Sequence, residues 1–173
     1  MASEPLTWRR PVSADHARIM AVIDNWWGGR SMQAMVPRLF LDHFSGTSYV
    51  VEDADGGLAA FIIAFASPDD PETTYVHFIG VDPARRGRGL GRELYARISA
   101  EAVERGCSRL KAVTSPVNTA SQAFHRSIGF EVGDPVPDYD APDEPRIPLL
   151  LRLPSPHSRS AAGSAEGYRD SSP

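Results

Sequence analysis

The chain has 173 residues, of which 42% are apolar and 23% are charged, and its formal net charge is −4. This composition is typical of a globular protein, and the length suits one domain. The acidic balance argues against a general binder of nucleic acids or of anionic membranes, since both kinds of binding need an excess of basic residues. We therefore expect neither nucleic acid nor membrane as a partner.

The cysteine content and the lengths of the apolar runs indicate the cellular compartment of the protein. The single cysteine, Cys107, excludes an internal disulfide framework and a multi-cysteine metal site, and we expect it to be a small buried residue. The start of the chain has no apolar run of the kind found in signal peptides. The longest apolar run, residues 58–66, is far shorter than the ~20 residues that cross a bilayer. The sequence therefore predicts a cytoplasmic protein.

The composition changes near the C-terminal end. Residues 154–173 are rich in proline, serine and glycine and have almost no large apolar side chain. Such a segment gains too little from burial to fold. We predict a single folded domain over residues 1–153 and a disordered tail over residues 154–173.

Hydrophobic periodicity predicts the order strand, two helices, three strands, helix, strand, helix and two strands. Helices are expected where apolar residues recur at helical spacing, and strands where β-branched and aromatic residues lie between turn residues. The expected ranges in chain order are a strand over 7–12, a helix over 13–27 capped by Ser13, a helix over 37–44, strands over 47–52, 58–66 and 73–81, a helix over 89–105, a strand over 108–114, a helix over 119–128, a short strand near 130 and a strand over 147–153. A mixed sheet with helices on both faces is the economical packing of this order.

Residues 85–92 form a turn rich in arginine and glycine between a predicted strand and a predicted helix. Glycine lets successive backbone N–H groups point at one place, the helix N-terminus adds partial positive charge, and arginine binds phosphate through paired hydrogen bonds. The spacing of the three glycines fits neither a P-loop nor the dinucleotide-binding fingerprint. We predict a phosphate-binding turn of another kind; the alternative is a solvated turn without a ligand.

Two sequence blocks carry a family resemblance. Residues 86–91 read Arg-Gly-Arg-Gly-Leu-Gly, and residues 118–130 begin with Asn118 and end with Gly129 and Phe130. At this separation they resemble the two signature motifs of the GNAT superfamily of acyl-CoA-dependent N-acyltransferases. The resemblance implies an α/β fold with a mostly antiparallel sheet of six or seven strands and helices on both faces. It also implies that acyl-CoA lies where the fourth and fifth strands separate.

The resemblance further implies which residues hold acetyl-CoA. The N–H groups of the turn would bind the pyrophosphate, with Arg85 and Arg88 as side-chain helpers, and the preceding strand would pair with the pantetheine arm. Asn118 would anchor the same arm or act as a plain helix cap. The implied cofactor-binding residues are Ile79, Val81, Arg86, Gly87, Arg88, Gly89, Leu90, Gly91, Arg92 and Asn118. No metal is predicted, because the histidines outside these motifs lack metal-ligand spacing.

Two histidines are the candidate catalytic residues. His125 stands where many members of the family have a tyrosine that protonates the departing thiolate, and an imidazolium with an ordinary pKa of about 6.5 can do the same near neutral pH. His77 resembles the histidine that acts as the base in arylalkylamine acetyltransferases of this superfamily. Period-2 alternation predicts that Tyr75, His77, Ile79 and Val81 share one face of their strand. The alternative for each histidine is a packing role with a satisfied hydrogen bond.

By the same resemblance, the acceptor pocket lies between residues 26–30 and the loop over residues 133–145. The candidate substrate-binding residues are Trp26, Trp27, Tyr75 and Tyr139. The acidic side chains of the loop favour a cationic amine, unless they are only solvated charges. The two tryptophans are alternatively core or dimer-contact residues.

The sequence as a whole predicts an enzyme that moves an acetyl group from acetyl-CoA directly to a primary amine of a small molecule. A protein amine is a second acceptor to consider, as are O-acylation and a longer acyl group. A non-catalytic acyl-CoA-binding or regulatory module is the rival from a different class, because the usual tyrosine is absent at position 125. The family often forms dimers, which implies a homodimer here.

Overall fold

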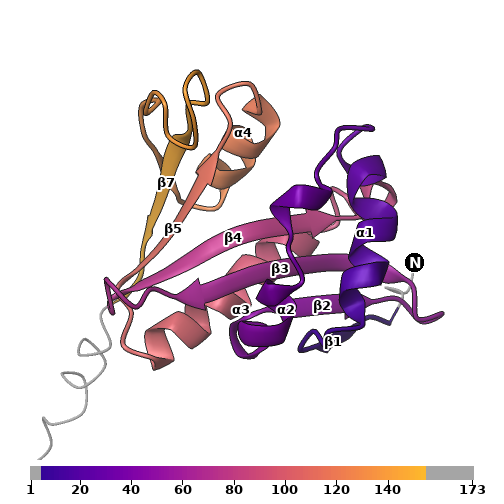
Figure 1. The fold of residues 1–173 in the computed structure, drawn as a ribbon. Coiled ribbons are helices and arrows are strands. Elements are labelled where there is room, and N and C mark those ends of the chain that lie inside the picture. Colours follow the sequence, from indigo (N-terminus) through magenta and orange to yellow (C-terminus); the bar gives the residue numbers. More distant parts are fainter. Residues whose placement is uncertain (1–4, 155–173) are drawn as a thin grey trace, which may run out of the picture.

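The computed structural model describes residues 5–154, which form one seven-stranded sheet with helices on both faces (Figure 1). The strand order is β1-β2-β3-β4-β5-β7-β6, and only β4 and β5 run parallel. The predicted mostly antiparallel α/β fold is thus confirmed. Residues 1–4 of the predicted domain and residues 155–173 of the predicted tail lie outside the described residues.

The elements follow the predicted order. The strands are β1 (Thr7–Arg9), β2 (Tyr49–Glu52), β3 (Leu58–Ala66), β4 (Thr73–Val81), β5 (Arg109–Thr114), β6 (Glu131–Val132) and β7 (Ile147–Arg152). The helices are α1 (Asp15–Trp26), α2 (Leu39–His43), α3 (Leu90–Glu104) and α4 (Thr119–Ser127), with 3₁₀ turns η1 (Gln33–Met35), η2 (Ser45–Thr47) and η3 (Pro83–Arg85). The ranges predicted for β3 and β4 are confirmed to the residue.

The start of α1 differs from the prediction, because Ser13 does not cap it. The Ser13 hydroxyl donates to Asp42 instead, and the cap residue is Ala14, without a side-chain hydrogen bond. Asp15 fixes the helix start by accepting from the N–H of Val12 at 2.8 Å. A carboxylate in the first turn is also favourable for the helix dipole.

The segment after α1 is also less regular than predicted. The expected helix over 37–44 shortens to α2, and the strand expected from residue 47 begins at Tyr49. The hydroxyls of Thr47 and Ser48 donate to the carbonyl of Phe44, so these residues form the η2 turn. Such local side-chain bonds compete with the strand ladder.

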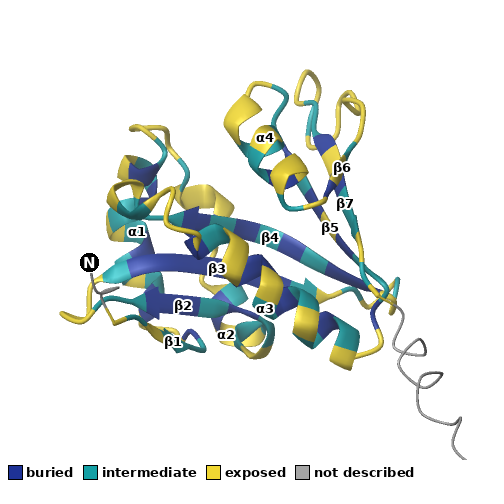
Figure 2. Ribbon diagram, turned by 180° about the vertical axis from the view of Figure 1, so that it is seen from behind, coloured by how far each residue is buried: buried dark blue, intermediate teal, exposed yellow. Residues whose placement is uncertain are grey.

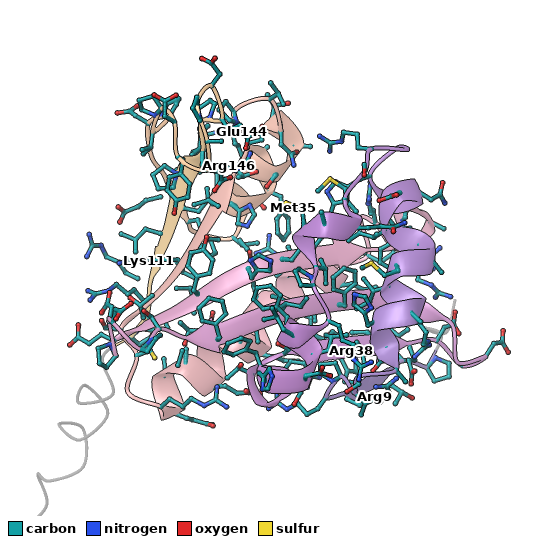
Figure 3. The ribbon with its side chains drawn as sticks, viewed as in Figure 1. Arg9, Met35, Arg38, Lys111, Glu144 and Arg146 are labelled. Atoms are coloured by element: carbon teal, nitrogen blue, oxygen red, sulfur yellow. The ribbon has the colours of Figure 1, made fainter. Side chains whose placement is uncertain are left out.

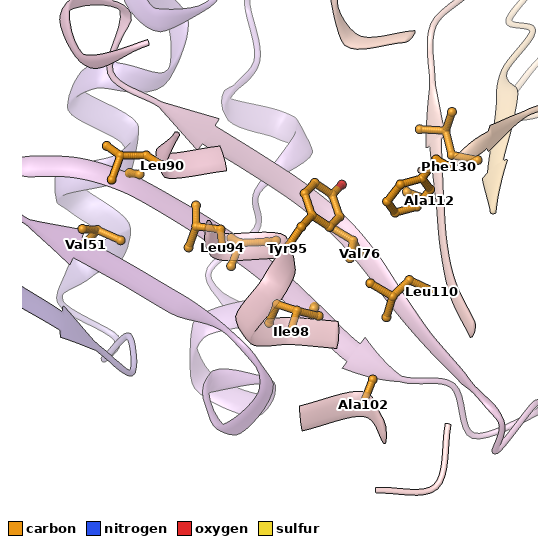
Figure 4. Close-up of a cluster of buried hydrophobic side chains, with 14 of the residues drawn as sticks. Val51, Val76, Leu90, Leu94, Tyr95, Ile98, Ala102, Leu110, Ala112 and Phe130 are labelled. Carbon is orange, nitrogen blue, oxygen red and sulfur yellow. The ribbon is translucent and has the colours of Figure 1, made fainter. Parts of the chain in front are cut away.

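The two faces of the sheet carry separate apolar clusters. Alternate residues of β3 divide between them: Phe61 and Ile63 face α1 and α2, whereas Ala60 and Ile62 face α3. The central strands are buried on both faces (Figure 2). Figure 4 shows the cluster on the α3 face, which reaches across to β5. These clusters make β1–β4 a rigid platform for the site.

A shift in the pairing of β3 and β4 breaks the expected alternation at His77. Phe78 pairs with Ile63, but Val76 already pairs with Ala64, so His77 has no partner across the ladder. The prediction that Tyr75, His77, Ile79 and Val81 share one face is therefore wrong. Tyr75 and His77 contact rings on the α1/α2 side, and the other two pack on the α3 cluster. The extra residue, His77, thus shifts the alternation, so the odd-numbered residues of β4 point to one face before it and to the other face after it.

The parallel strands β4 and β5 pair over only three residues before they separate. Thr73–Tyr75 lie opposite Arg109–Lys111, and beyond this point the two strands diverge in a V (Figure 1). α4 packs on the α3 side of the diverging half, and no described helix covers its other face (Figure 1). Within residues 5–154, no helix is long and apolar enough to span a bilayer, and no three His, Cys, Asp or Glu side chains group as metal ligands.

Candidate active site

A cavity of about 720 Å³ lies between the end of α1, the end of β4, the start of α3 and α4. Thirteen of the predicted site residues line it: Trp26, Trp27, Ile79, Val81, Arg85, Arg86, Gly87, Gly89, Leu90, Gly91, Arg92, Asn118 and His125. The other four predicted site residues, Arg88, His77, Tyr75 and Tyr139, do not line this cavity. The structure therefore gathers most of the predicted cofactor residues around one space.

Glycines allow the backbone to turn at the cavity wall. Gly87 and Gly89 have φ angles of 75° and 86°, in the left-handed region that disfavours residues with a Cβ. Gly89 is also the cap residue of α3, so the N–H groups of Leu90, Gly91 and Arg92 have no carbonyl partner within the helix. Unpaired N–H groups and the positive end of the helix dipole form an anion-binding site.

Gly91 brings α3 close to α4. A Cβ built at this position would lie 3.0 Å from Cζ of Phe124. The Phe124 ring would have to shift to make room for a methyl group at this position. The glycine therefore allows the close approach of the Phe124 ring to the start of α3.

The arginines of the turn divide into two kinds. Arg85 pairs with Asp53 at 2.7 Å and has a side chain only 17% exposed, so it fastens the turn to the β2–β3 hairpin. Arg86 donates to the carbonyls of Trp26 at 2.6 Å and Val81 at 3.2 Å. Arg88 is exposed. Arg92 lines the cavity, and its guanidinium donates to the carbonyl of Ser127 at a distance of 3.2 Å. Arg88 and Arg92 are thus the side chains with more freedom to meet a phosphate.

Asn118 caps α4 and lines the cavity. Its side-chain oxygen accepts from the N–H of Ser121 at 3.1 Å. The capping interpretation is therefore confirmed, and the cap leaves the amide NH₂ as a possible donor to another partner. The predicted contact of Asn118 with the pantetheine arm stays a prediction.

His125 is held at both ring nitrogens. Nδ1 lies 2.7 Å from the carbonyl oxygen of Ser121, and Nε2 lies 2.8 Å from the hydroxyl oxygen of Tyr95 (Figure 4 shows Tyr95). A carbonyl only accepts, so Nδ1 carries the proton, and the neutral ring accepts at Nε2 from the Tyr95 hydroxyl. The residue is 4% exposed, and this burial lowers its pKa. His125 is therefore neutral at pH 7, and its N–H is already bonded.

His77 lies on the other face of the sheet. Its Nε2 donates to the carbonyl of Met35 at 2.7 Å, and its ring stacks on Phe40 at 4.1 Å between centroids. Burial lowers the pKa of His77, with the Met35 carbonyl acting in the opposite direction. These contacts fasten the η1 segment to β4. The catalytic role predicted for His77 has no contact with the main cavity to support it.

Tyr75 and Tyr139 come together in a second cavity of about 380 Å³. It lies on the uncovered face of β5 and β7, beside Lys111. Burial raises the pKa of Tyr75 to about 12, and the nearby Tyr139 and Asp140 add to the shift. Figure 3 shows Met35 on one side of the gap between the diverging strands, and Arg146 on the other.

Some residues at the site were not predicted. Ser121 and Phe124 line the main cavity, and Tyr95 lies directly behind His125. The helical spacing of four from Ser121 to His125 was a usable signal, since such residues share a helix face. Nothing in the sequence near Tyr95 distinguishes it from the other apolar positions of α3.

Comparisons with known proteins agree with this geometry. The Acetyltransferase (GNAT) family model matches residues 13–130. The L-2,4-diaminobutyric acid acetyltransferase of Nocardia farcinica is 33% identical over 121 residues, 66% of this chain and 62% of that protein. Its namesake from Streptomyces coelicolor is 35% identical over 119 residues, 63% of this chain and 70% of that protein. The chain thus spans less than two thirds of the first relative's length.

A solved structure shares the fold. The diaminobutyrate acetyltransferase of Paenibacillus lautus, in complex with L-2,4-diaminobutyric acid and coenzyme A, matches with a TM-score of 0.63. The match covers 85% of this chain and 95% of that chain at 24% identity, so it bears on the fold alone. The family model spans both motifs and most of the sheet. The chain therefore belongs to the acetyltransferase (GNAT) family.

Proposed function

We propose that this protein is an N-acetyltransferase that moves an acetyl group from acetyl-CoA to a primary amine of a small molecule. The observation that carries the proposal is the cavity at the start of α3, whose wall is a turn with two left-handed glycines and unpaired N–H groups. Its volume of about 720 Å³ lies within the range of small-molecule sites. The relatives named as acetyltransferases support the same reaction.

Acetyl-CoA would enter with its pyrophosphate against the turn. The N–H groups of Leu90, Gly91 and Arg92 would donate to phosphate oxygens at the positive end of α3, and Arg88 would add charge from the exposed side. The pantetheine arm would run past Ile79 and Val81 toward the gap between β4 and β5. The thioester would then lie near His125.

The acceptor would approach from the opposite side of the same gap. Tyr75 and Tyr139 line the cavity there, beside a loop that carries Asp140 and Glu144. Lys111 also lines this cavity, and Asp140 pairs with Arg146 at 2.6 Å, so the rim offers both signs of charge, which suits an acceptor that carries a carboxylate as well as a cationic amine. Since two relatives are named for L-2,4-diaminobutyric acid, we propose a small amino acid with a second amine as the acceptor class.

The ammonium group of the acceptor first gives one proton to solvent, since only the neutral amine can attack, and one proton then remains to be moved during the reaction itself. The amine nitrogen attacks the thioester carbonyl, the carbon–sulfur bond breaks, and the proton lost by nitrogen is matched by one gained by sulfur. A group placed beside both atoms accelerates this transfer typically 10²- to 10⁴-fold.

The cytoplasmic location, the homodimer and the absence of a metal stay predictions.

The test is release of coenzyme A thiol from acetyl-CoA by the purified protein, against a panel of amines. The panel contains 2,4-diaminobutyrate, ornithine, neutral monoamines and anionic amines, with acetyl-CoA affinity measured in parallel. We expect turnover with diamino acids and little with anionic amines. Binding without turnover on any amine would favour the non-catalytic module. Absence of acetyl-CoA binding would overturn the proposal at its base.

A further inference from the structure

We propose that Lys111 binds the carboxylate of an amino-acid acceptor in the second cavity, and that it thereby selects amino acids over simple amines. The inference rests on the proposed function and deepens it, because it names the group that recognises the acceptor. Lys111 is the only lysine among the 173 residues, in which the other strongly basic side chains are all arginine. It is also the one basic side chain among the described residues that line this cavity.

Lys111 points to the uncovered face of the sheet, near the closed end of the V. Its neighbours along β5, Leu110 and Ala112, are buried in the cluster on the α3 face, so period-2 alternation directs Lys111 to the other face. Figure 3 shows Lys111 nearer than Arg146 to the point where the strands meet. An acceptor with its carboxylate at Lys111 would therefore extend from the closed end of the V toward the gap between β4 and β5.

A lateral row of side chains crosses the uncovered face at Lys111. On one side Lys111 lies opposite Tyr75 of β4, the last paired position before these two strands diverge. On the other side it lies opposite Leu150 of β7, and Leu150 in turn lies opposite Glu131 of β6. Residues that pair across strands share a face of the sheet. The four residues therefore stand side by side along one wall of the second cavity, which each of them lines.

The charges in this row suit a zwitterion. Lys111 and Glu131 are two strands apart, which places their Cα atoms roughly 10 Å from each other, with the apolar Leu150 between them. Each bonds to another side chain instead: Glu131 pairs with Arg152 at 3.1 Å, and Lys111 pairs with Asp70 at 3.2 Å. A small amino acid between them would have its carboxylate beside the cation and its ammonium group beside the anion.

The bond to Asp70 leaves Lys111 able to bind a ligand. Nζ lies 3.2 Å from Oδ2 of Asp70, and this contact uses one of the three N–H donors of the ammonium group. Asp70 also accepts from Arg109 at 2.9 Å and from the Thr73 hydroxyl at 2.7 Å, so it stays paired when Lys111 turns toward the cavity. The Lys111 side chain is 46% exposed, so this turn costs little burial.

Arg146 is the other cation whose charge acts on Tyr75, and its contacts argue against the same role. Its Nε donates to Asp140 at 2.6 Å, and its side chain is only 23% exposed. Arg146 is not among the described residues that line the second cavity. We therefore assign to Arg146 the fastening of its own loop, and to Lys111 the contact with the carboxylate.

Loss of the charge at position 111 should change acceptor preference more than the rate of transfer. The probes are 2,4-diaminobutyrate and its amide, which differ only in the carboxylate, and the preference is the ratio of their kcat/KM values. Hydrogen bonds between charged groups are among the stronger ones in proteins. Lys111→Met should therefore lower the preference for the acid about 10- to 100-fold, mainly through KM. Lys111→Arg, which keeps the positive charge, should retain most of the preference.

Arg109→Met is the matched control. Like Lys111→Met, it removes one cation from Asp70 on the same strand and the same face. Arg109 is not among the described residues that line the second cavity or the hollow of about 200 Å³ beside Asp70. The control should keep the wild-type preference. Acetyl-CoA affinity should be the same in all three variants, and thermal melts establish that they fold.

The charge of Lys111 can also be removed from the folded wild-type protein, because the sequence has no other lysine. An N-hydroxysuccinimide ester of acetic acid acetylates Lys111 and the α-amino group. The same treatment of Lys111→Arg modifies the α-amino group without changing position 111. The treated wild type should lose the preference for the acid, whereas treated Lys111→Arg should keep it. This measurement does not depend on how Lys111→Met folds.

The outcomes separate this inference from the proposed function. A wild-type preference in Lys111→Met overturns the inference, and so does an equal loss of kcat/KM for the acid and the amide. Wild-type turnover that is equal for the two probes, or confined to amines without a carboxylate, overturns it as well. All these results leave acetyl transfer standing. Absence of turnover with any amine overturns the proposed function itself.

Discussion

The two faces of the sheet each hold one of the candidate histidines, and they use the ring in opposite ways. On the α1/α2 face, Nε2 of His77 carries the proton and donates to the Met35 carbonyl. On the α3 face, Nδ1 of His125 carries the proton, and Nε2 accepts from Tyr95. Only the second arrangement can take up a proton at a nitrogen joined to a hydroxyl. The same residue type is thus a structural clamp on one face and a candidate base on the other.

The difference has a local cause on each face. The unpaired position of His77 in the β3–β4 ladder turns its ring onto Phe40, away from the cavity at the end of β4. The helical spacing of Ser121 and His125 brings a backbone carbonyl to Nδ1 of the second histidine. Backbone geometry therefore decides which ring nitrogen is free, and with it which chemistry each histidine can perform.

The largest effect on the α3 face is expected at Gly89. A valine there must adopt the left-handed conformation, which costs a residue with a Cβ roughly 1–2 kcal/mol, so we expect acetyl-CoA binding to weaken about 5- to 30-fold. Quenching of tryptophan fluorescence by CoA measures the change, because Trp26 and Trp27 line the cavity. Gly46→Ala is the control, since nothing lies within 4 Å of the point that its added methyl group would occupy and its φ is not left-handed. Equal affinity in Gly89→Val would contradict the turn as the phosphate site.

A second variant should lower stability on the α1/α2 face without changing catalysis. Asp15, the first residue of α1, is buried, and its burial cost is outweighed by hydrogen bonds from Arg9, Val12 and Arg18, so its pKa falls to about 2. A carboxyl with a lowered pKa stabilises the fold above its ordinary pKa near 4, and this contribution is lost as the pH falls toward 2. We expect Asp15→Asn to lower the free energy of unfolding by about 2 kcal/mol at pH 7.

Urea unfolding from pH 7 to pH 2 measures this contribution. The wild-type free energy of unfolding should fall through the acid range more steeply than that of Asp15→Asn. Turnover by the folded variant should match the wild type, because Asp15 lines neither cavity. Parallel pH curves for the two proteins would show that the ion pair with Arg9 contributes nothing.

The smallest effect on stability is expected at His77, again with little effect on catalysis. Glutamine keeps an N–H for the Met35 carbonyl but loses the stacked ring on Phe40, worth about 1 kcal/mol of stability. We expect kcat within 2-fold of wild type and an unchanged acidic limb of the kcat/KM profile. If the acidic limb of the kcat/KM profile disappeared in His77→Gln, His77 would be the base, as the sequence resemblance implies. His125 would then not be the base.

The glycine-rich turn before α3 was predictable because its features are local. Gly87, Gly89 and the start of α3 lie within a few residues, and the strand before them shows a clear pattern. The ranges of β3 and β4 were predictable for the same reason. Alternating apolar residues bounded by turn residues leave little freedom in register.

The parts that the sequence missed depend on contacts between distant segments. The extra residue at His77 follows from how β4 meets β3, which alternation within one strand does not reveal. Tyr95 and His125 are 30 residues apart and meet only when α3 packs on α4. Arg85 pairs with Asp53, 32 residues away, a contact that the sequence did not reveal, while its predicted help in binding phosphate stays a prediction. Long-range pairings of this kind come from tertiary packing rather than from local pattern.

The central claim is that the cavity at the start of α3 binds acetyl-CoA for transfer to an amine. Calorimetric titration of acetyl-CoA into the wild-type protein, followed by thiol release with 2,4-diaminobutyrate in the same preparation, tests it most directly. The account predicts binding of one acetyl-CoA per chain in the micromolar range, weaker binding in Gly89→Val, and release of thiol with the diamino acid. A titration without heat of binding, or binding untouched by Gly89→Val, would contradict it.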